Sequence, residues 1–99
     1  GFVGSATDVK PTASGLEKTN DVAKASVTEK VLAAYDFAIA AIKNSSEDKW
    51  NEQIKLFGRF DATRIQAINK CFEHLTHHRG QTTVYIRLAG GTPPAEKLF

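Results

Sequence analysis

The 99-residue chain has one cysteine, no methionine and no long apolar run. The single cysteine, Cys71, excludes an intramolecular disulfide, so we expect a cytoplasmic protein. Without a bilayer-length apolar segment or the basic region and apolar core of a signal peptide, no membrane contact is predicted. The net charge of only +2, with both signs interspersed, predicts no nucleic-acid partner. Because the chain begins at Gly1 and lacks methionine, we expect a processed, tagged or truncated product.

The length allows one small domain, and its first quarter has no clear secondary-structure pattern. Residues 1–25 are rich in Gly, Ser, Thr, Lys and Asp and predict irregular loop. A structureless stretch of this size is long for a connection within a compact domain, where most connections have about 4–6 residues. We therefore interpret residues 1–25 as a functional loop or as a linker that follows an element missing from the chain.

The first helical pattern covers residues 27–43. Ser26 and Glu29 fit a capping box, in which the serine hydroxyl and the glutamate side chain satisfy backbone donors of the first turn. After this helix, residues 47–57 predict a short helix or an extended segment, with Trp50 as a packing residue. The apolar stripe of the helix expected at residues 27–43 consists of Val31, Tyr35, Ile39 and Ile42.

The second and longer helical pattern covers residues 62–89. Asp61 is the expected N-cap, and Gly90 is the expected stop. Gly80 lies inside this helix, where glycine costs about 1 kcal/mol relative to alanine, so we expect a closely packed neighbouring helix. Two helices cannot bury both apolar stripes by themselves, which predicts further helices from another chain or a missing segment.

All three histidines of the chain lie in this longer helix, within residues 73–81. His74 and His78 have i, i+4 spacing and point from one face, about 40° apart around the axis, so they can bind one divalent metal ion. His77 has a poorer angle and is expected at the surface. The same spacing also occurs in helices where histidines are only satisfied polar residues, so the spacing alone leaves both interpretations open.

Three other side chains continue the strip of the histidine pair. Gln81 and Tyr85 are candidates for hydrogen bonds to a metal ligand or to a substrate. Cys71 is a candidate for such a contact, or for a third ligand from the same helix. We favour Cys71 as a small buried apolar residue, because one face of one helix rarely wraps three ligands around a metal. No catalytic residue can be assigned from the spacing.

Several motifs together resemble the C-terminal half of a DinB-family protein. The resemblance covers about residues 20–96. It implies an all-α, up-down four-helix bundle, of which this chain supplies the last two helices. Residues 26–99 would then be the C-terminal half of the bundle, and residues 1–25 the linker after a missing second helix. The motifs are Thr63-Arg64, His74-Leu75-Thr76-His77-His78-Arg79-Gly80-Gln81, Tyr85-Ile86-Arg87-Leu88-Ala89-Gly90 and Pro93-Pro94.

The resemblance also implies a divalent metal ion held by three histidines, with His74 and His78 as two of them. The metal would be Zn²⁺ or Ni²⁺. The family's third ligand lies on the second helix, and no histidine precedes His74 here. We therefore expect that ligand outside this chain, on another chain that carries the missing N-terminal half or in a homodimer.

The activity that the resemblance implies is that of a metal-dependent enzyme acting on a small molecule. Thiol-dependent S-transferase and hydrolase are the two expected reaction types. The alternative is a non-catalytic helical stress or interaction protein whose metal site is incomplete. The presence or absence of a third donor near the histidine pair separates these two classes.

Overall fold

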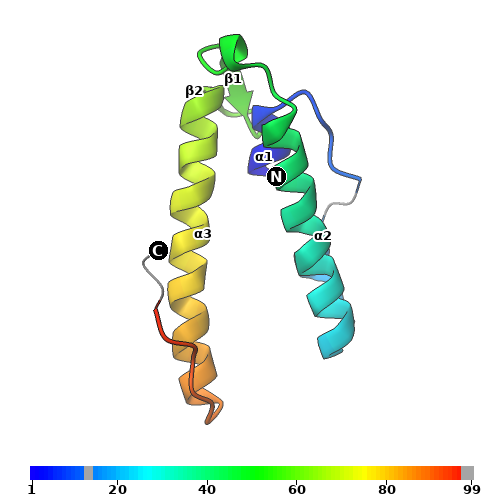
Figure 1. Cartoon of the computed structure of the whole chain (residues 1–99), viewed down its shortest axis with the longest axis vertical. Helices are drawn as coiled ribbons and strands as arrows, with labels where there is room; N and C mark the ends of the chain where they lie inside the picture. Colours follow the sequence, from blue (N-terminus) through cyan, green and yellow to red (C-terminus); the bar gives the residue numbers. More distant parts are fainter. Residues whose placement is uncertain (13–14, 97–99) are drawn as a thin grey trace.

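The computed structural model of the protein describes residues 1–12 and 15–96. Residues 13–14 of the expected linker and residues 97–99 of the expected C-terminal half lie outside the described residues. The elements are α1 (Phe2–Ala6), α2 (Lys24–Lys43), β1 (Gln53–Leu56), β2 (Phe60–Thr63) and α3 (Arg64–Leu88), with 3-10 turns at Leu16–Lys18 and Glu47–Lys49. Figure 1 shows the long helices α2 and α3 connected at one end by the β1–β2 hairpin, with α1 between them near that end.

The prediction of an all-α chain that supplies two helices of a four-helix bundle was wrong. The described residues form three α-helices and a two-stranded antiparallel sheet. Both alternatives predicted for residues 47–57 occur, since the 3-10 turn is followed by strand β1. In β1, Ile54 and Leu56 alternate with more exposed polar residues, which is the period of a half-buried strand. Phe57 and Gly58 both have positive φ, which turns the chain into β2.

The capping box predicted at Ser26 was wrong. Helix α2 begins at Lys24, and its N-cap, Ala23, makes no side-chain capping bond. Ser26 therefore lies inside the first turn, where its hydroxyl accepts a hydrogen bond from Lys30 Nζ at 2.8 Å. Asp21 instead accepts from the backbone N–H of Ala23 at 3.2 Å, just before the helix. The C-terminal end at Lys43 agrees with the prediction.

Helix α3 has a capping box, although not at the predicted residue. Thr63 Oγ1 accepts from the backbone N–H of Gln66 at 3.2 Å, and Gln66 Oε1 accepts from the backbone N–H of Thr63 at 2.8 Å. Asp61, the predicted cap, belongs to β2 and forms an ion pair with Lys55 across the hairpin at 2.6 Å. The predicted stop is confirmed, because Gly90 follows the helix with φ +79.

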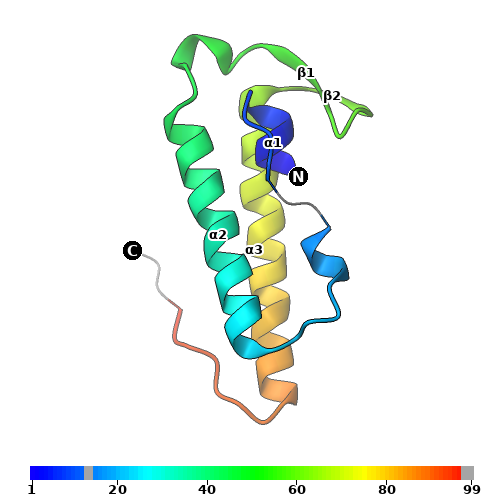
Figure 2. The ribbon, with the colours of Figure 1, turned by 90° about the vertical axis from the view of Figure 1, so that its right-hand side faces the viewer.

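Helix α1 lies in the segment predicted to be loop, and it packs against α3. Figure 2, turned by 90°, also places α1 alongside the first half of α3. Arg64 of α3 donates to the carbonyl of Ala6 at 3.2 Å and to the carboxylates of Asp8 and Glu52 at 2.8 and 3.0 Å. This one side chain thus ties the end of α1 to the start of α3. The small core beneath it consists of Ala6, Leu56 and Ala67, with Phe2, Ile54 and Ile68 packed against them.

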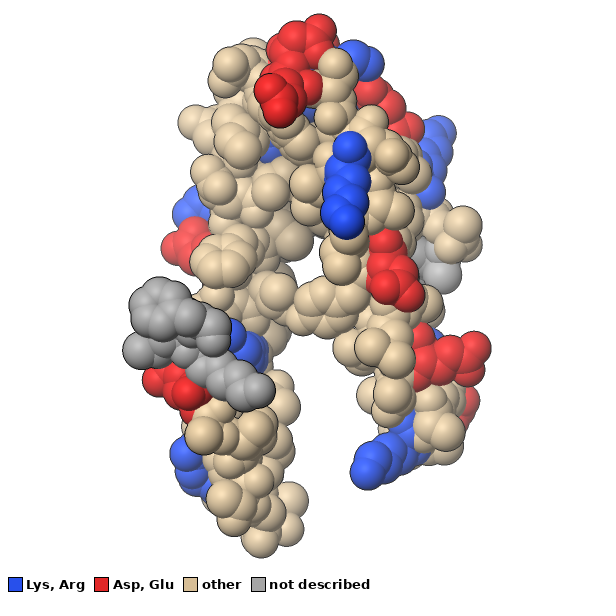
Figure 3. Space-filling view, viewed as in Figure 1, with Lys and Arg blue, Asp and Glu red and all other residues tan. Residues whose placement is uncertain are grey.

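The two long helices leave much of their apolar surface uncovered. The accessible surface is 8080 Å², whereas a compact monomer of 10.8 kDa exposes about 5,500 Å². The radius of gyration is 15.5 Å, against about 12.6 Å for a compact domain of this length. Figure 3 shows an opening between α2 and α3. The sides of the two helices that face each other across it carry few charged side chains. Exposed apolar residues of the two helices include Val31, Tyr35, Ile39, Leu75 and Tyr85.

The middle of α3 is built from residues that favour helix weakly. Thr76, Thr82 and Thr83 each donate their hydroxyl to a backbone carbonyl three or four residues earlier, at 2.8–3.0 Å. Such back-bonding competes with the helical hydrogen bonds and tends to bend the helix. A Cβ at Gly80 would meet nothing within 4 Å among the described residues, so the close neighbour expected there is not part of the described chain and stays a prediction for the assembled protein. None of the described helices combines the length and the apolar character that crossing a membrane requires.

Candidate metal centre

The rings of His74 and His78 converge on the surface of α3. Their Nε2 atoms lie 3.0 Å apart, and the two ring planes are 86° from parallel. With metal–nitrogen bonds of about 2.05 Å, that separation corresponds to an angle of about 94° at a shared ion. A tetrahedral angle needs about 3.35 Å between the nitrogens, so the pair has to open by about 0.35 Å. In the distance between their Nε2 atoms, the two side chains are therefore close to what one divalent ion requires.

Gln81 contacts the other nitrogen of His78. Its Oε1 lies 2.9 Å from His78 Nδ1. An amide oxygen only accepts hydrogen bonds, so Nδ1 carries the proton and His78 Nε2 presents its lone pair towards His74. His74 Nε2 then donates to His78 Nε2 across the 3.0 Å contact. A proton thus joins the two rings, and a shared metal ion would have to replace this hydrogen bond.

The third histidine does not join this pair. The His77 ring lies beside that of His78, with centroids 5.3 Å apart and an interplanar angle of 69°. No nitrogen–nitrogen contact forms between them in the part of the chain that the structure describes. His77 instead lines, with His74, an open hollow between α3 and the hairpin.

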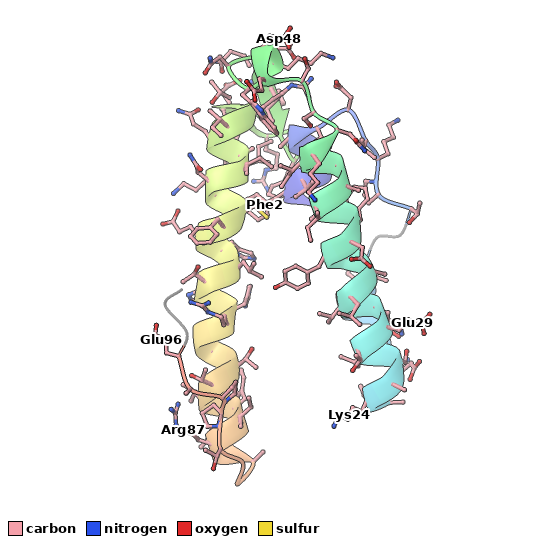
Figure 4. The ribbon with its side chains drawn as sticks, in the orientation of Figure 1. Phe2, Lys24, Glu29, Asp48, Arg87 and Glu96 are labelled. Carbon is pink, nitrogen blue, oxygen red and sulfur yellow. The ribbon has the colours of Figure 1, made fainter. Side chains whose placement is uncertain are left out.

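An aromatic wall borders the pair on the side of α1. The Phe2 ring packs against that of His74, with centroids 5.3 Å apart, and the rings of Phe2 and Phe57 pack edge to face, with centroids 4.8 Å apart. Figure 4 labels Phe2, the first residue of α1, on the side of α1 that faces α3. Together with Leu56 and Phe60 of the hairpin, these rings line the hollow that reaches His74. This wall was missed in the sequence because no local pattern links Phe2 to a helix that begins sixty residues later.

Cys71 and Tyr85, the other candidates, do not contact the pair. Partial burial raises the pKa of the Cys71 thiol, so the thiolate, the form that binds metals, is disfavoured. Cys71 lies instead with Leu75 and Phe2 in the crevice between α2 and α3. The Tyr85 ring is 66% exposed, and within residues 1–12 and 15–96 its hydroxyl makes no hydrogen bond. Of the three candidates, Gln81 is the one with a hydrogen bond to a histidine within residues 1–12 and 15–96.

A third donor does not come from the residues that the structure describes. Nowhere in residues 1–12 and 15–96 do three His, Cys, Asp or Glu side chains gather in a way that could hold a metal ion. The described chain therefore brings two nitrogen donors together and orients one of them through an amide.

The structure defines a helical protein that presents a histidine pair on its longest helix, beside an aromatic wall. The sequence model described as DinB family matches residues 15–98. Because this match spans most of the chain, the chain belongs to the DinB family, which confirms the resemblance. No curated protein and no solved structure gives a significant match to the chain.

Proposed function

We propose that His74 and His78 bind one divalent metal ion, Zn²⁺ or Ni²⁺, as part of a metal-dependent enzyme. The observation that carries this proposal is the 3.0 Å separation of the two Nε2 atoms, combined with the hydrogen bond from His78 Nδ1 to Gln81. The two nitrogens lie close to the separation that one ion requires, and the His78 lone pair is already on the nitrogen next to His74. DinB-family membership supports the proposal, because the motif that resembles the family is the one that carries these histidines.

The reaction we propose is a thiol-dependent S-transfer or a hydrolysis of a small molecule. When bound, a divalent ion lowers the pKa of a thiol or a water molecule and so supplies a nucleophile at neutral pH. Phe2 packs against one side of the His74 ring, and Phe57 packs against Phe2, so an apolar surface borders the exposed histidine pair. The hollow beside them has room for a substrate next to the histidine pair.

We further propose that a partner chain covers the open faces of α2 and α3 and supplies the third donor. The chain exposes about 2,500 Å² more than a compact protein of its mass. Obligate interfaces bury about 2,000–5,000 Å² summed over both partners, or about 1,000–2,500 Å² on each, so this surplus is at the upper end of what one permanent partner covers. The partner is a chain that carries the family's N-terminal half, or a second copy of this chain.

The alternative is a non-catalytic interaction protein, and one observation favours it. The described residues supply two donors, one fewer than the three protein ligands that catalytic zinc sites usually have. X-ray absorption of the metal-loaded protein counts the coordinated imidazoles. Three imidazoles support the enzyme, and two support the non-catalytic alternative.

Metal analysis of the purified protein tests the proposed site. We expect about one divalent ion per assembled protein in the wild type and a loss of most of it in His74→Ala and in His78→Ala. His77→Ala is the matched control, because it removes a histidine from the same helix without removing either converging nitrogen. Equal metal content in all four proteins would rule out binding by this pair.

Native mass determination tests the proposed partner. We expect a species larger than the 10.8 kDa chain. A second chain of different mass identifies a heteromer, and a doubled mass identifies the second copy. A stable, compact monomer of 10.8 kDa would contradict the partner without bearing on the histidine pair.

A further inference from the structure

We infer that Gln81 is a positioning residue that selects one tautomer of His78 and so prepares its Nε2 for the metal ion. This inference rests on the proposed function, since it assumes that His78 is a ligand. It goes further by assigning a separate task to a side chain that does not touch the metal. The inference is based on the 2.9 Å contact between His78 Nδ1 and Gln81 Oε1.

The chemistry of imidazole explains why such a residue matters. A neutral histidine carries its proton on either ring nitrogen, and only the nitrogen without the proton can bind a metal. An acceptor at Nδ1 selects the Nδ1–H form and leaves the lone pair on Nε2. It also restricts rotation of the ring, because the hydrogen bond fixes the direction of Nδ1. Both effects keep the His78 lone pair on Nε2, the nitrogen that lies 3.0 Å from His74 Nε2.

The two histidines are held in different ways. Within the described part of the chain, His74 Nδ1 makes no hydrogen bond, and the His74 ring is placed by its packing against Phe2. His78 is held by the side chain three residues further along its own helix. Because residues at i and i+3 are neighbours on a helix, the amide reaches the ring without help from another element. The effect of Gln81 should therefore be confined to His78.

The experiment compares three full-length variants with the wild type. Gln81→Leu removes the acceptor, and Gln81→Glu keeps an oxygen acceptor at the same distance. Gln53→Leu is the matched control, because Gln53 is an exposed glutamine in β1, away from the histidines. Zinc affinity is measured by competition with a chromophoric chelator. The tautomer of His78 is measured in the metal-free protein from the nitrogen chemical shifts of its ring.

We expect Gln81→Leu to weaken zinc binding by about 10–100-fold, the usual effect of losing such a hydrogen bond to a ligand. The Nδ1–H tautomer of His78 should decline in the same variant, while the helix content stays that of the wild type. Gln81→Glu should bind zinc at least as tightly as the wild type, because a carboxylate is a stronger acceptor. Gln53→Leu should change neither affinity nor tautomer.

Two results would overturn the inference while leaving the proposed metal site intact. One is unchanged affinity and an unchanged His78 tautomer in Gln81→Leu. The other is an equal loss of affinity in Gln81→Glu and Gln81→Leu, which would assign Gln81 a task other than accepting the Nδ1 proton. Failure of the proposed function has a different signature, namely full zinc binding in His78→Ala.

Discussion

Replacing Gly80 by alanine should stabilise the chain. Gly80 has no positive φ, and an added Cβ would meet nothing within 4 Å among the described residues. The change therefore introduces no clash, and it gains the difference in helix propensity, about 1 kcal/mol. For a domain of this size, that corresponds to a rise of about 4–8 °C in the midpoint of thermal unfolding. Thermal and urea unfolding followed by circular dichroism at 222 nm measure both quantities.

Gly90→Ala is the matched control for this prediction, since it makes the same chemical change ten residues later. Gly90 has φ +79, where an alanine side chain costs about 1–2 kcal/mol, so this variant should be destabilised. A neutral or destabilising Gly80→Ala, with Gly90→Ala behaving as expected, would refute the reasoning. It would mean that a neighbour in the assembled protein lies against Gly80, as the sequence predicted.

Two further predictions concern the start of α3 and the ties around it. Thr63→Ala should lower the free energy of unfolding by about 1 kcal/mol through loss of the cap, whereas Ser26→Ala should stay within about 0.5 kcal/mol; urea unfolding measures both. Hydrogen bonds from Lys49 and Arg64 hold the pKa of Asp8 below its ordinary 3.8, so its stabilising effect is present above that pH and lost as the pH falls below it. Asp8→Asn should therefore flatten the acid side of the stability profile, and an unchanged acid titration would contradict this role.

The two long helices were predictable because their signals are local. Residues 27–43 and 62–89 carry apolar positions at helical spacing over several turns, and the structure places α2 and α3 within three residues of these bounds. The capping residues were less predictable. Asp61, a good cap by composition, belongs to the hairpin, because Ile54 and Leu56 bury their side chains and draw the segment into a strand.

Helix α1 was not predictable from its own residues. It has five residues, too few to be stable alone, and its composition is that of a loop. Its stability comes from burying Ala6 against Leu56 and Ala67, and from the hydrogen bond that Arg64 donates to its last carbonyl. Those partners lie at least fifty residues away in the sequence. No local pattern reports contacts of that kind.

The candidate site also has one part that the sequence predicts and another part that depends on packing between distant segments. The i, i+4 spacing predicts that His74 and His78 share a face, and the i+3 position brings Gln81 to His78, because helix geometry fixes both. Metal binding itself stays a prediction. The contact between Phe2 and His74 could not be foreseen, since it depends on how α1 packs. Cys71 and Tyr85 lie on the same strip of the helix by their spacing, but no hydrogen bond joins either of them to the pair among the described residues; Cys71 lines the crevice towards α2, and Tyr85 is exposed.

The weak helix formers in the middle of α3 surround the histidine pair, and this links ion binding to local order. Thr76, Gly80, Thr82 and Thr83 make this stretch more prone to open than the capped start at Thr63. An ion held by both histidines binds only the helical form, so it raises the population of that form. In turn, the apparent affinity falls by the fraction of molecules in which the stretch is open. The proposed metal would then act as a local folding ligand, and its removal would raise amide exchange around residues 76–83 before the rest of α3.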